Sequence, residues 1–239
     1  MSFLVPTRRY DERIVEMVDE PNADPAMLRD ELKNLRRINK YFGGLSAIES
    51  SVLSVLRDVP DGREVHILDL GTGSADLPIH LVERSGRTRR KFHITAVENN
   101  PVVFQVARER ASRYAGIVVE RGNLLELDYP PKSFDVVLCS LTLHHFSNVQ
   151  ATHILSSMNT WSRVGLIVND LYRSWVAAWS AKLYSLLTTR NPMTIYDSYL
   201  SVLRGFTREE LVMIARTAGI QKVEIQTRPL FRIILLAKQ

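Results

Sequence analysis

Residues 66–76 read HILDLGTGSAD and predict a buried strand that runs into a glycine turn, with a helix beginning directly after it. Gly71 and Gly73 permit a sharp turn at the carboxyl end of a parallel strand, and such a turn leaves backbone N–H groups free. A ligand can then lie directly against the backbone. This stretch therefore predicts a site for a nucleotide-like cofactor.

Strand and helix patterns alternate on both sides of that turn. The expected strands are residues 65–70, 93–98, 117–120, 135–140 and 164–169, and the expected helices between them are 77–83, 101–112 and 148–158. Alternation of this kind predicts an α/β fold with a parallel, doubly wound sheet. Two further strands, 223–226 and 231–236, are separated by a short turn and predict a closing antiparallel hairpin.

Two segments depart from the alternation. Residues 1–60 have helical spacing and predict a helical cap in front of a main domain at 61–239. Residues 171–206 are rich in Trp, Tyr and Leu and predict an insertion of two helices after the fifth strand, which could act as a lid. Thr207 and Glu210 have the spacing of a capping box, which predicts the start of another helix.

Composition limits the partners and the compartment. The chain of 239 residues has a net charge of +5 and a pI of about 9.4, which favours an anionic partner. Its densest basic stretch, residues 84–91, lacks interleaved aromatic residues, so we interpret it as a solvated loop and expect no nucleic-acid partner. Cys139 is the only cysteine, and there is neither a secretory apolar segment nor a membrane-length apolar run. We therefore expect a cytoplasmic protein without a transmembrane segment.

Two carboxylates narrow the choice of cofactor. A dinucleotide fingerprint requires a third small residue three places after Gly73, where this chain has Asp76. A carboxylate at a helix start repels a pyrophosphate but leaves a phosphate-free cofactor unaffected. Glu98, at the end of the second expected strand, can accept hydrogen bonds from both hydroxyls of a ribose. Its alternative is an ordinary surface acid.

The remaining motifs carry a family resemblance. They are Arg37-Ile38-Asn39, Gly43-Gly44, Gly122-Asn123, Phe134-Asp135-Val136-Val137, Leu141-Thr142-Leu143-His144-His145-Phe146 and Asn169-Asp170-Leu171-Tyr172-Arg173-Ser174. With the glycine turn, they resemble class I S-adenosylmethionine-dependent methyltransferases over about residues 65–170, and the closing hairpin fits as well. Within that family, the chain resembles bacterial small-molecule methyltransferases that act on phenols, quinols and aromatic polyketides. The resemblance implies a Rossmann-like, seven-stranded sheet.

The resemblance also implies positions for the cofactor, S-adenosylmethionine, and its product, S-adenosylhomocysteine. Asp69 is expected near the amino group of the methionine part, and Glu98 at the ribose. Asn123 stands where the family usually has an Asp facing the adenine amine; its alternative is a simple turn residue. Ala75 replaces a usual glycine and suits the loop only if no positive φ is needed. The full expected set is Asp69, Gly71, Thr72, Gly73, Glu98, Asn99, Asn123, Leu124, Cys139 and Ser140.

Candidate catalytic residues follow the fourth and fifth strands. A histidine is suited to remove the proton of a phenol acceptor, and His144 and His145 stand where the acceptor pocket of such folds begins. We favour His144 slightly; the alternative for each is packing against the next helix. Asp170 could orient a hydroxyl, or could pair with Arg173 to fix the following helix. No metal-ligand spacing is evident, so we expect metal-independent catalysis.

The insertion supplies candidates for the wall of the acceptor pocket. Five aromatic residues are expected to line it or, alternatively, to pack in the core; they are Trp175, Trp179, Tyr184, Tyr196 and Tyr199. The predicted function is methyl transfer to a small, aromatic, hydroxylated acceptor, with oxygen favoured over carbon, by a monomer or homodimer. The alternatives are an RNA methyltransferase and a cofactor-binding protein without catalysis.

Overall fold

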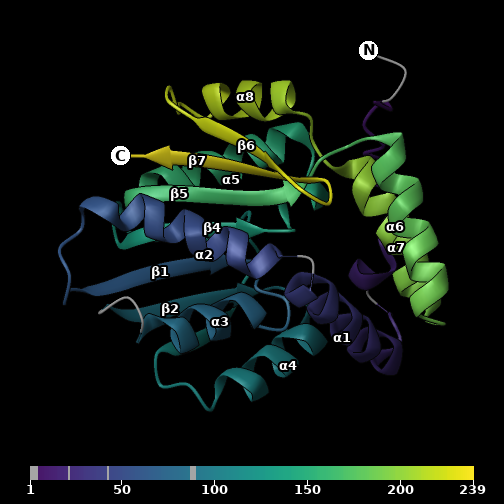
Figure 1. Cartoon of the computed structure of the whole chain (residues 1–239), viewed down its shortest axis with the longest axis horizontal. Helices are drawn as coiled ribbons and strands as arrows, with labels where there is room; N and C mark the ends of the chain where they lie inside the picture. The colour runs from purple at the N-terminus through teal and green to yellow at the C-terminus, as the bar shows by residue number, and fades with distance from the viewer. Residues whose placement is uncertain (1–4, 21, 42, 87–89) are drawn as a thin grey trace.

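A computed structural model describes residues 5–20, 22–41, 43–86 and 90–239, and its centre is a seven-stranded sheet (Figure 1). The strands are β1 (Glu64–Leu70), β2 (Lys91–Glu98), β3 (Ile117–Arg121), β4 (Phe134–Ser140), β5 (Ser162–Leu171), β6 (Glu224–Arg228) and β7 (Arg232–Lys238). Their order across the sheet is β3-β2-β1-β4-β5-β7-β6. β7 pairs antiparallel with β5 and β6, whereas the other neighbours are parallel. The predicted fold class, including the closing hairpin, is confirmed.

Helices cover both faces of the sheet and one of its ends. They are α1 (Pro25–Tyr41), α2 (Gly44–Val55), α3 (Asp76–Ser85), α4 (Pro101–Ala111), α5 (Asn148–Trp161), α6 (Trp175–Thr188), α7 (Pro192–Arg204) and α8 (Arg208–Thr217). In Figure 1, α2, α3 and α4 lie over one face, and α5 and α8 over the other. None of the helices in the described ranges is long and apolar enough to cross a membrane.

The sequence explains these elements locally. The central strands are nearly continuous apolar runs, because helices bury both of their faces; Ile67 and Leu68, successive residues of β1, are both fully buried. Asn100 caps α4 by accepting hydrogen bonds from the backbone of its first turn, directly before Pro101. The capping box predicted at Thr207 and Glu210 is present at the start of α8.

The end of the sheet where β5 and the other parallel strands finish carries a separate group of elements. Figure 1 shows α1, α6 and α7 gathered beside this end. The segment before α1 joins them: the Arg9 N–H donates to Leu203 O at 3.0 Å, and the Met17 N–H donates to a carboxylate oxygen of Asp197 at 2.8 Å. The segment before α1 and the helix α7, which are far apart in the sequence, therefore meet beside the strand ends.

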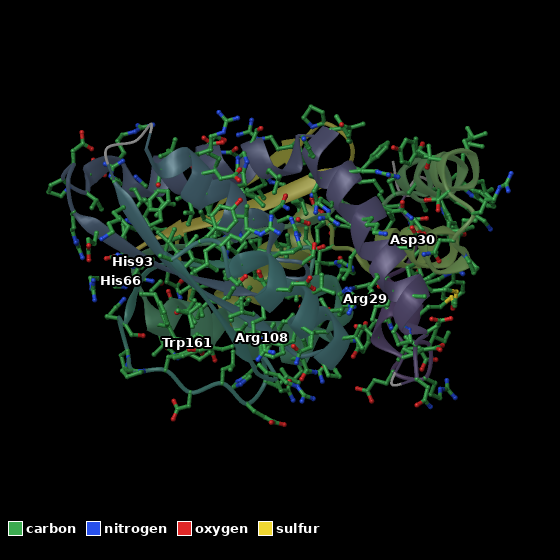
Figure 2. The ribbon with its side chains drawn as sticks, turned by 90° about the horizontal axis from the view of Figure 1, so that it is seen from below. Arg29, Asp30, His66, His93, Arg108 and Trp161 are labelled. Atoms are coloured by element: carbon green, nitrogen blue, oxygen red, sulfur yellow. The ribbon has the colours of Figure 1, made fainter. Side chains whose placement is uncertain are left out.

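Other parts of the chain lie away from this end. His66 and His93 stack across β1 and β2 with ring centroids 5.3 Å apart, and Figure 2 shows them far from Arg29 and Asp30 of α1. They are thus distant from the carboxyl ends of the parallel strands. Residues 87–89, at the centre of the predicted basic loop, lie outside the described residues. The neighbouring Arg90 donates to Val59 O at 2.7 Å.

Candidate functional site

The glycine turn after β1 has the geometry that the sequence predicts. Gly71 has φ +68, and a Cβ atom at this position would lie 2.4 Å from side-chain atoms of Thr142. Thr142 in turn donates its hydroxyl to Gly71 O at 3.2 Å. The Gly73 N–H donates to Glu98 Oε2 at 3.0 Å. The turn is therefore fixed by the segment after β4 on one side and by the end of β2 on the other.

Two residues just after the turn correct the sequence-based reasoning. Ala75 has φ +58, so it does adopt the positive φ that the prediction required it to avoid. The left-handed region costs a non-glycine residue about 1 kcal/mol or more. Asp76 is not a free negative charge at the start of α3, because Arg110 forms an ion pair with it at 2.5 Å. Asp76 would therefore repel a pyrophosphate less strongly than an unpaired carboxylate would.

A cavity of about 240 Å³ opens beside the turn, at the strand ends. Its wall combines the glycine turn with the segment before α1, with α1, α2 and α7, and with the residues after β4 and at the start of β7. The polar lining residues are Glu16, Glu31, Asn39, Asp69, Thr72, Ser74, Asp76, Ser140, His144, His145, Thr194, Asp197, Ser198, Ser201 and Arg232. Most of the remaining wall is aliphatic, which suits a small, largely apolar ligand with a few polar groups.

The expected cofactor residues divide into two groups. Asp69, Gly71, Thr72, Gly73 and Ser140 line the cavity. The second group lies outside the lining and comprises Glu98, Asn99, Asn123, Leu124 and Cys139.

Residues of the second group already have partners of their own. Asn123 Oδ1 accepts the Leu125 N–H at 3.2 Å, and its amide donates to Glu126 at 2.9 Å, which is the local bonding of a turn residue. Cys139 is buried in the core, where burial raises the pKa of its thiol well above the usual range.

Asp69 is the carboxylate that best fits a positively charged ligand group. Burial, with an added contribution from the charge of Glu98, raises its pKa to about 7. The neighbouring Thr72 hydroxyl partly offsets this rise. A buried carboxylate whose negative charge is penalised is suited to the ammonium group of an amino-acid-like ligand.

His144 and Asp170 form a buried pair behind the cavity. His144 Nδ1 lies 2.6 Å from Asp170 Oδ1, and the His144 backbone N–H donates to Asp170 Oδ2 at 3.0 Å. A proton on Nδ1 that is shared with Asp170 leaves Nε2 of the neutral ring as an acceptor. The alternative pairing does not occur, since Arg173 forms its ion pair with Glu210 at 2.6 Å.

His145 has a different environment from its neighbour. Burial alone would lower its pKa, but the charges of Glu16 and Asp19, together with a 2.6 Å hydrogen bond to Asp19, raise it to about 10. His145 is therefore a cation at neutral pH and cannot accept a proton. Of the two candidate bases, only His144 has the required geometry.

Glu16 completes the polar wall. Its Oε1 lies 3.7 Å from His144 Nε2 and has no hydrogen-bond partner among the described atoms. Donor atoms of Glu16, His144 and His145 all lie within 4.8 Å of one another, so these three residues are the ones close enough to share a metal ion in the described ranges. Two features compete with metal binding by these residues. Glu16 forms an ion pair with Arg204 at 3.5 Å, and His145 is protonated at neutral pH.

The predicted aromatic wall is wrong. None of the five aromatic residues of the insertion lines the cavity, and Trp179, Tyr184 and Tyr196 are exposed. The insertion instead contributes residues that are mostly small or polar, namely Leu171, Ala181, Thr194, Asp197, Ser198, Ser201 and Val202. The reason lies in the orientation of α6, which turns its alanines toward α7 and its large side chains outward.

Sequence reasoning missed several polar residues of the site. Glu16 and Asp19 precede the first helix, and no pattern in the sequence connects them with the histidines. Arg232 occupies the first position of β7 and donates to Asn39 Oδ1 at 2.8 Å. Only Thr142 carried a usable signal, because it lies within the motif that contains the two histidines.

Comparison with known proteins agrees with this geometry. Residues 67–165 match a family described as a methyltransferase domain, which includes the glycine turn and both histidines. A methyltransferase described as dependent on S-adenosylmethionine, from Aquifex aeolicus, has a similar solved structure, with a TM-score of 0.61 and 17% identity. The superposition covers 90% of this chain and 98% of that one, and it shows a shared fold.

Curated relatives match over shorter lengths. The demethylmenaquinone methyltransferase of Tropheryma whipplei is 33% identical over 133 residues, which is 49% of this chain and 52% of the relative. The ubiquinone/menaquinone biosynthesis C-methyltransferase of Rhizobium meliloti is 30% identical over 95 residues, or 38% of this chain and 36% of the relative. The chain thus spans between a third and about half the length of the curated relatives that it matches.

Proposed function

We propose, on the premise that this chain contains a class I methyltransferase domain, that it transfers a methyl group from S-adenosylmethionine to a small hydroxylated aromatic acceptor. The observation that carries the proposal is the His144–Asp170 pair at the wall of a cavity that begins at the glycine turn. The family match, the cavity size and its aliphatic lining support an acceptor of low molecular weight.

Two of the expected cofactor residues, Asp69 and Gly73, fit the group that the family implies. Asp69 is a buried carboxylate with a raised pKa, and an ammonium group would remove the cost of its negative charge. Gly73 leaves open space at the position of a Cβ, so a ligand can approach its backbone. When bound, the cofactor would supply a methyl group on a positively charged sulfur. Placing the acceptor oxygen in line with that methyl, with water excluded, is the largest contribution the cavity can make.

His144 is proposed as the general base. Nε2 would accept the hydroxyl proton of the acceptor while Asp170, which is buried and hydrogen-bonded to Nδ1, stabilises the imidazolium that forms. Burial raises the pKa of Asp170, but the hydrogen bonds from His144 and from the Leu171 N–H, together with the charge of His144 once it is protonated, lower it overall. His145, already a cation, and Glu16 would help to hold the acceptor.

Oxygen is the proposed target atom, and carbon is the second candidate. Removing the proton of a phenol makes its oxygen a better nucleophile and also increases the electron density of its ring. The name of the Rhizobium meliloti relative favours the carbon product. Chromatography and NMR of the methylated product from a phenol and quinol panel distinguish the two.

The first test is thermal unfolding in the presence of S-adenosylhomocysteine, with NADH as the control. A ligand at about 100 times its dissociation constant adds about 2.7 kcal/mol to the free energy of unfolding. Stabilisation by S-adenosylhomocysteine alone is expected. Stabilisation by NADH alone would overturn the proposal, and tight cofactor binding without turnover on any acceptor would leave a binding protein rather than an enzyme.

A further inference from the structure

The amphipathic arrangement of α6 is the reverse of the usual one. Its small residues face the protein: Ala177, Ala178 and Ser185 are buried, and Ser185 donates to Ser198 of α7 at 2.9 Å. Its large apolar residues are exposed and are Val176, Trp179, Leu183, Tyr184, Leu186 and Leu187, with Leu187 77% exposed. One edge of this set touches α7, where the Trp179 ring lies 5.4 Å from that of Tyr199. An amphipathic helix that packs on a core has the reverse arrangement, with its large apolar side chains turned inward.

The exposed residues form one continuous stripe. At 100° per residue, positions 176, 179, 183, 186 and 187 fall on the same side of the helix. In Figure 1, α6 lies at the edge of the molecule, separated from the sheet by α7. We call this set, with Tyr184, the α6 stripe. A large contiguous apolar surface of this kind marks an interaction site, because single exposed residues are common but such stripes are not.

The segment that carries the α6 stripe has charges of one sign. Residues 171–196 contain no Asp or Glu. Lys182 lies 5.4 Å from the ring centroid of Trp179, Arg190 is exposed just beyond the end of the helix, and Arg9 lies over the ring of Trp175 at its start. On the neighbouring helix α1, Asp30 accepts a hydrogen bond from Asn191 at 3.2 Å. Apolar side chains with Trp, flanked by Lys and Arg, are typical of helices that lie at a membrane surface.

The charge pattern also decides between a bilayer and a second copy of the chain. A symmetric dimer would bring the stripe against itself, so that the cations Lys182, Arg190 and Arg9 of one copy would lie close to cations of the other. Like charges across an interface are unfavourable, whereas anionic head groups would neutralise all three.

We propose that the α6 stripe docks this protein onto the surface of an anionic lipid bilayer. Leu183, Leu187 and Trp179 would enter the boundary between head groups and acyl chains, with the three cations at head-group level. The inner side of the same helix contributes Ala181 to the cavity wall, so docking places the cavity next to the membrane. An acceptor dissolved in the bilayer could then enter without crossing water. The docking itself requires no methyl transfer, so it stands or falls independently of the proposed activity.

The test is co-sedimentation of the full chain with vesicles. Phosphatidylglycerol mixed with phosphatidylcholine is compared with phosphatidylcholine alone, and the wild type is expected to bind the anionic vesicles more tightly. The double variant Leu183→Ser/Leu187→Ser should lower the partition coefficient at least about 10-fold, since two leucines leave the apolar phase. Lys182→Glu should lower binding several-fold on anionic vesicles and little on neutral ones.

Val149→Ser is the matched control, because Val149 is 80% exposed on α5 and lies outside the stripe. It should bind as the wild type does. The leucine and valine variants should keep the wild-type melting temperature, since the replaced side chains are exposed. Lys182→Glu should cost at most about 1 kcal/mol of stability, because it also removes the contacts of Lys182 with the Trp179 and Tyr199 rings. Three results would overturn the proposal: no sedimentation of the wild type with either vesicle, equal loss in the control and stripe variants, or a dimer in gel filtration that the stripe variant dissociates.

Discussion

The glycine turn and the helical insertion form opposite walls of one cavity, and they are built in different ways. The turn follows from eleven consecutive residues, 66–76, whose strand, glycines and helix start are read directly from the sequence. The opposite wall depends on contacts between segments far apart: Met17 and Val18 donate their backbone N–H groups to Asp197, and Arg204 forms an ion pair with Glu16. A cofactor site can thus be local in sequence while the acceptor site beside it is not.

The difference has a chemical counterpart. The turn presents backbone groups and one buried carboxylate, which suit a ligand common to many proteins. The opposite wall presents side chains that ionise, and burial raises the pKa of both Glu31 and Asp197 to about 7. Changes to the turn should therefore affect cofactor binding, whereas changes to the opposite wall should affect turnover or the choice of acceptor.

The largest expected effect is on turnover, at the His144–Asp170 pair. His144→Gln should lower kcat about 10²- to 10⁴-fold with little change in the affinity for S-adenosylhomocysteine, since the base acts only on the acceptor. Asp170→Asn should lower kcat by a similar factor. The measurement is steady-state kinetics combined with calorimetric binding.

Two controls accompany it. His145→Gln should lower kcat less than His144→Gln does. His145 is already protonated at neutral pH, so it cannot accept the proton of the acceptor. EDTA should leave the wild-type rate unchanged; a rate that EDTA abolishes and zinc restores would make the histidines metal ligands rather than a base and its neighbour.

The next effect is on the turn itself. Gly71→Ala should destabilise the fold by about 2–4 kcal/mol and abolish stabilisation by S-adenosylhomocysteine, because the new methyl group would overlap Thr142 at a strained φ. Gly73→Ala is the matched control: it also has a positive φ, but nothing lies within 4 Å of its Cβ position, so only about 1 kcal/mol should be lost. Equal losses in denaturant unfolding would refute the overlap.

A third prediction concerns pH and the cofactor. Since the pKa of Asp69 is about 7, its carboxyl becomes neutral below that pH and loses its attraction for an ammonium group. The dissociation constant of S-adenosylhomocysteine should rise about tenfold per pH unit below 7. Calorimetry from pH 8 to pH 5.5 measures this dependence. In the Asp69→Asn variant, the contribution of Asp69 to the pH dependence of the dissociation constant should disappear. If the pH dependence persists in full, the titrating group is Glu31 or Asp197 instead.

The same shift has a stability consequence of opposite direction. The folded pKa lies above the ordinary value of 3.8, so the folded chain binds a proton that the unfolded chain does not. The charged carboxylate therefore destabilises the ligand-free protein above pH 7, and this cost is lost as the pH falls from about 7 toward about 4.

The smallest expected effect is at Ala75. Ala75→Gly removes the cost of a positive φ but gives the unfolded chain more freedom, so the two effects nearly cancel. The net change should be a stabilisation of about 0.5 kcal/mol in denaturant unfolding. A loss of stability would mean that the alanine methyl, which is fully buried, contributes more through packing than its backbone costs.

These comparisons indicate what the sequence can predict. The alternation of strand and helix patterns predicted the strands and a parallel, doubly wound sheet. Each strand could be identified from its own apolar residues alone. The histidine motif and Asp170 were found because both follow buried strands, and strand ends meet at one edge of a parallel sheet. Glu16 and Arg232 were not found, because their place in the site depends on how the first and last segments cross that edge.

The aromatic lining failed for a related reason. Helical spacing shows which residues of 175–188 share a side, but it does not show which side faces the protein. The usual rule assigns large apolar residues to the interior. Here the alanines make the contact with α7, so Trp179 lies outside, and only the packed structure reveals it.

The position of Cys139 makes the molecule its own reporter of unfolding. The chain has no other cysteine, and this one lies in the middle strand of the sheet, paired with Leu70 on one side and Val168 on the other. A thiol-reactive dye can reach it only when the centre of the sheet opens. With a dye that reacts slowly, the rate of Cys139 labelling therefore reports the opening of the whole core, and no engineered cysteine is needed. Ligands that bind in the cavity should slow this labelling.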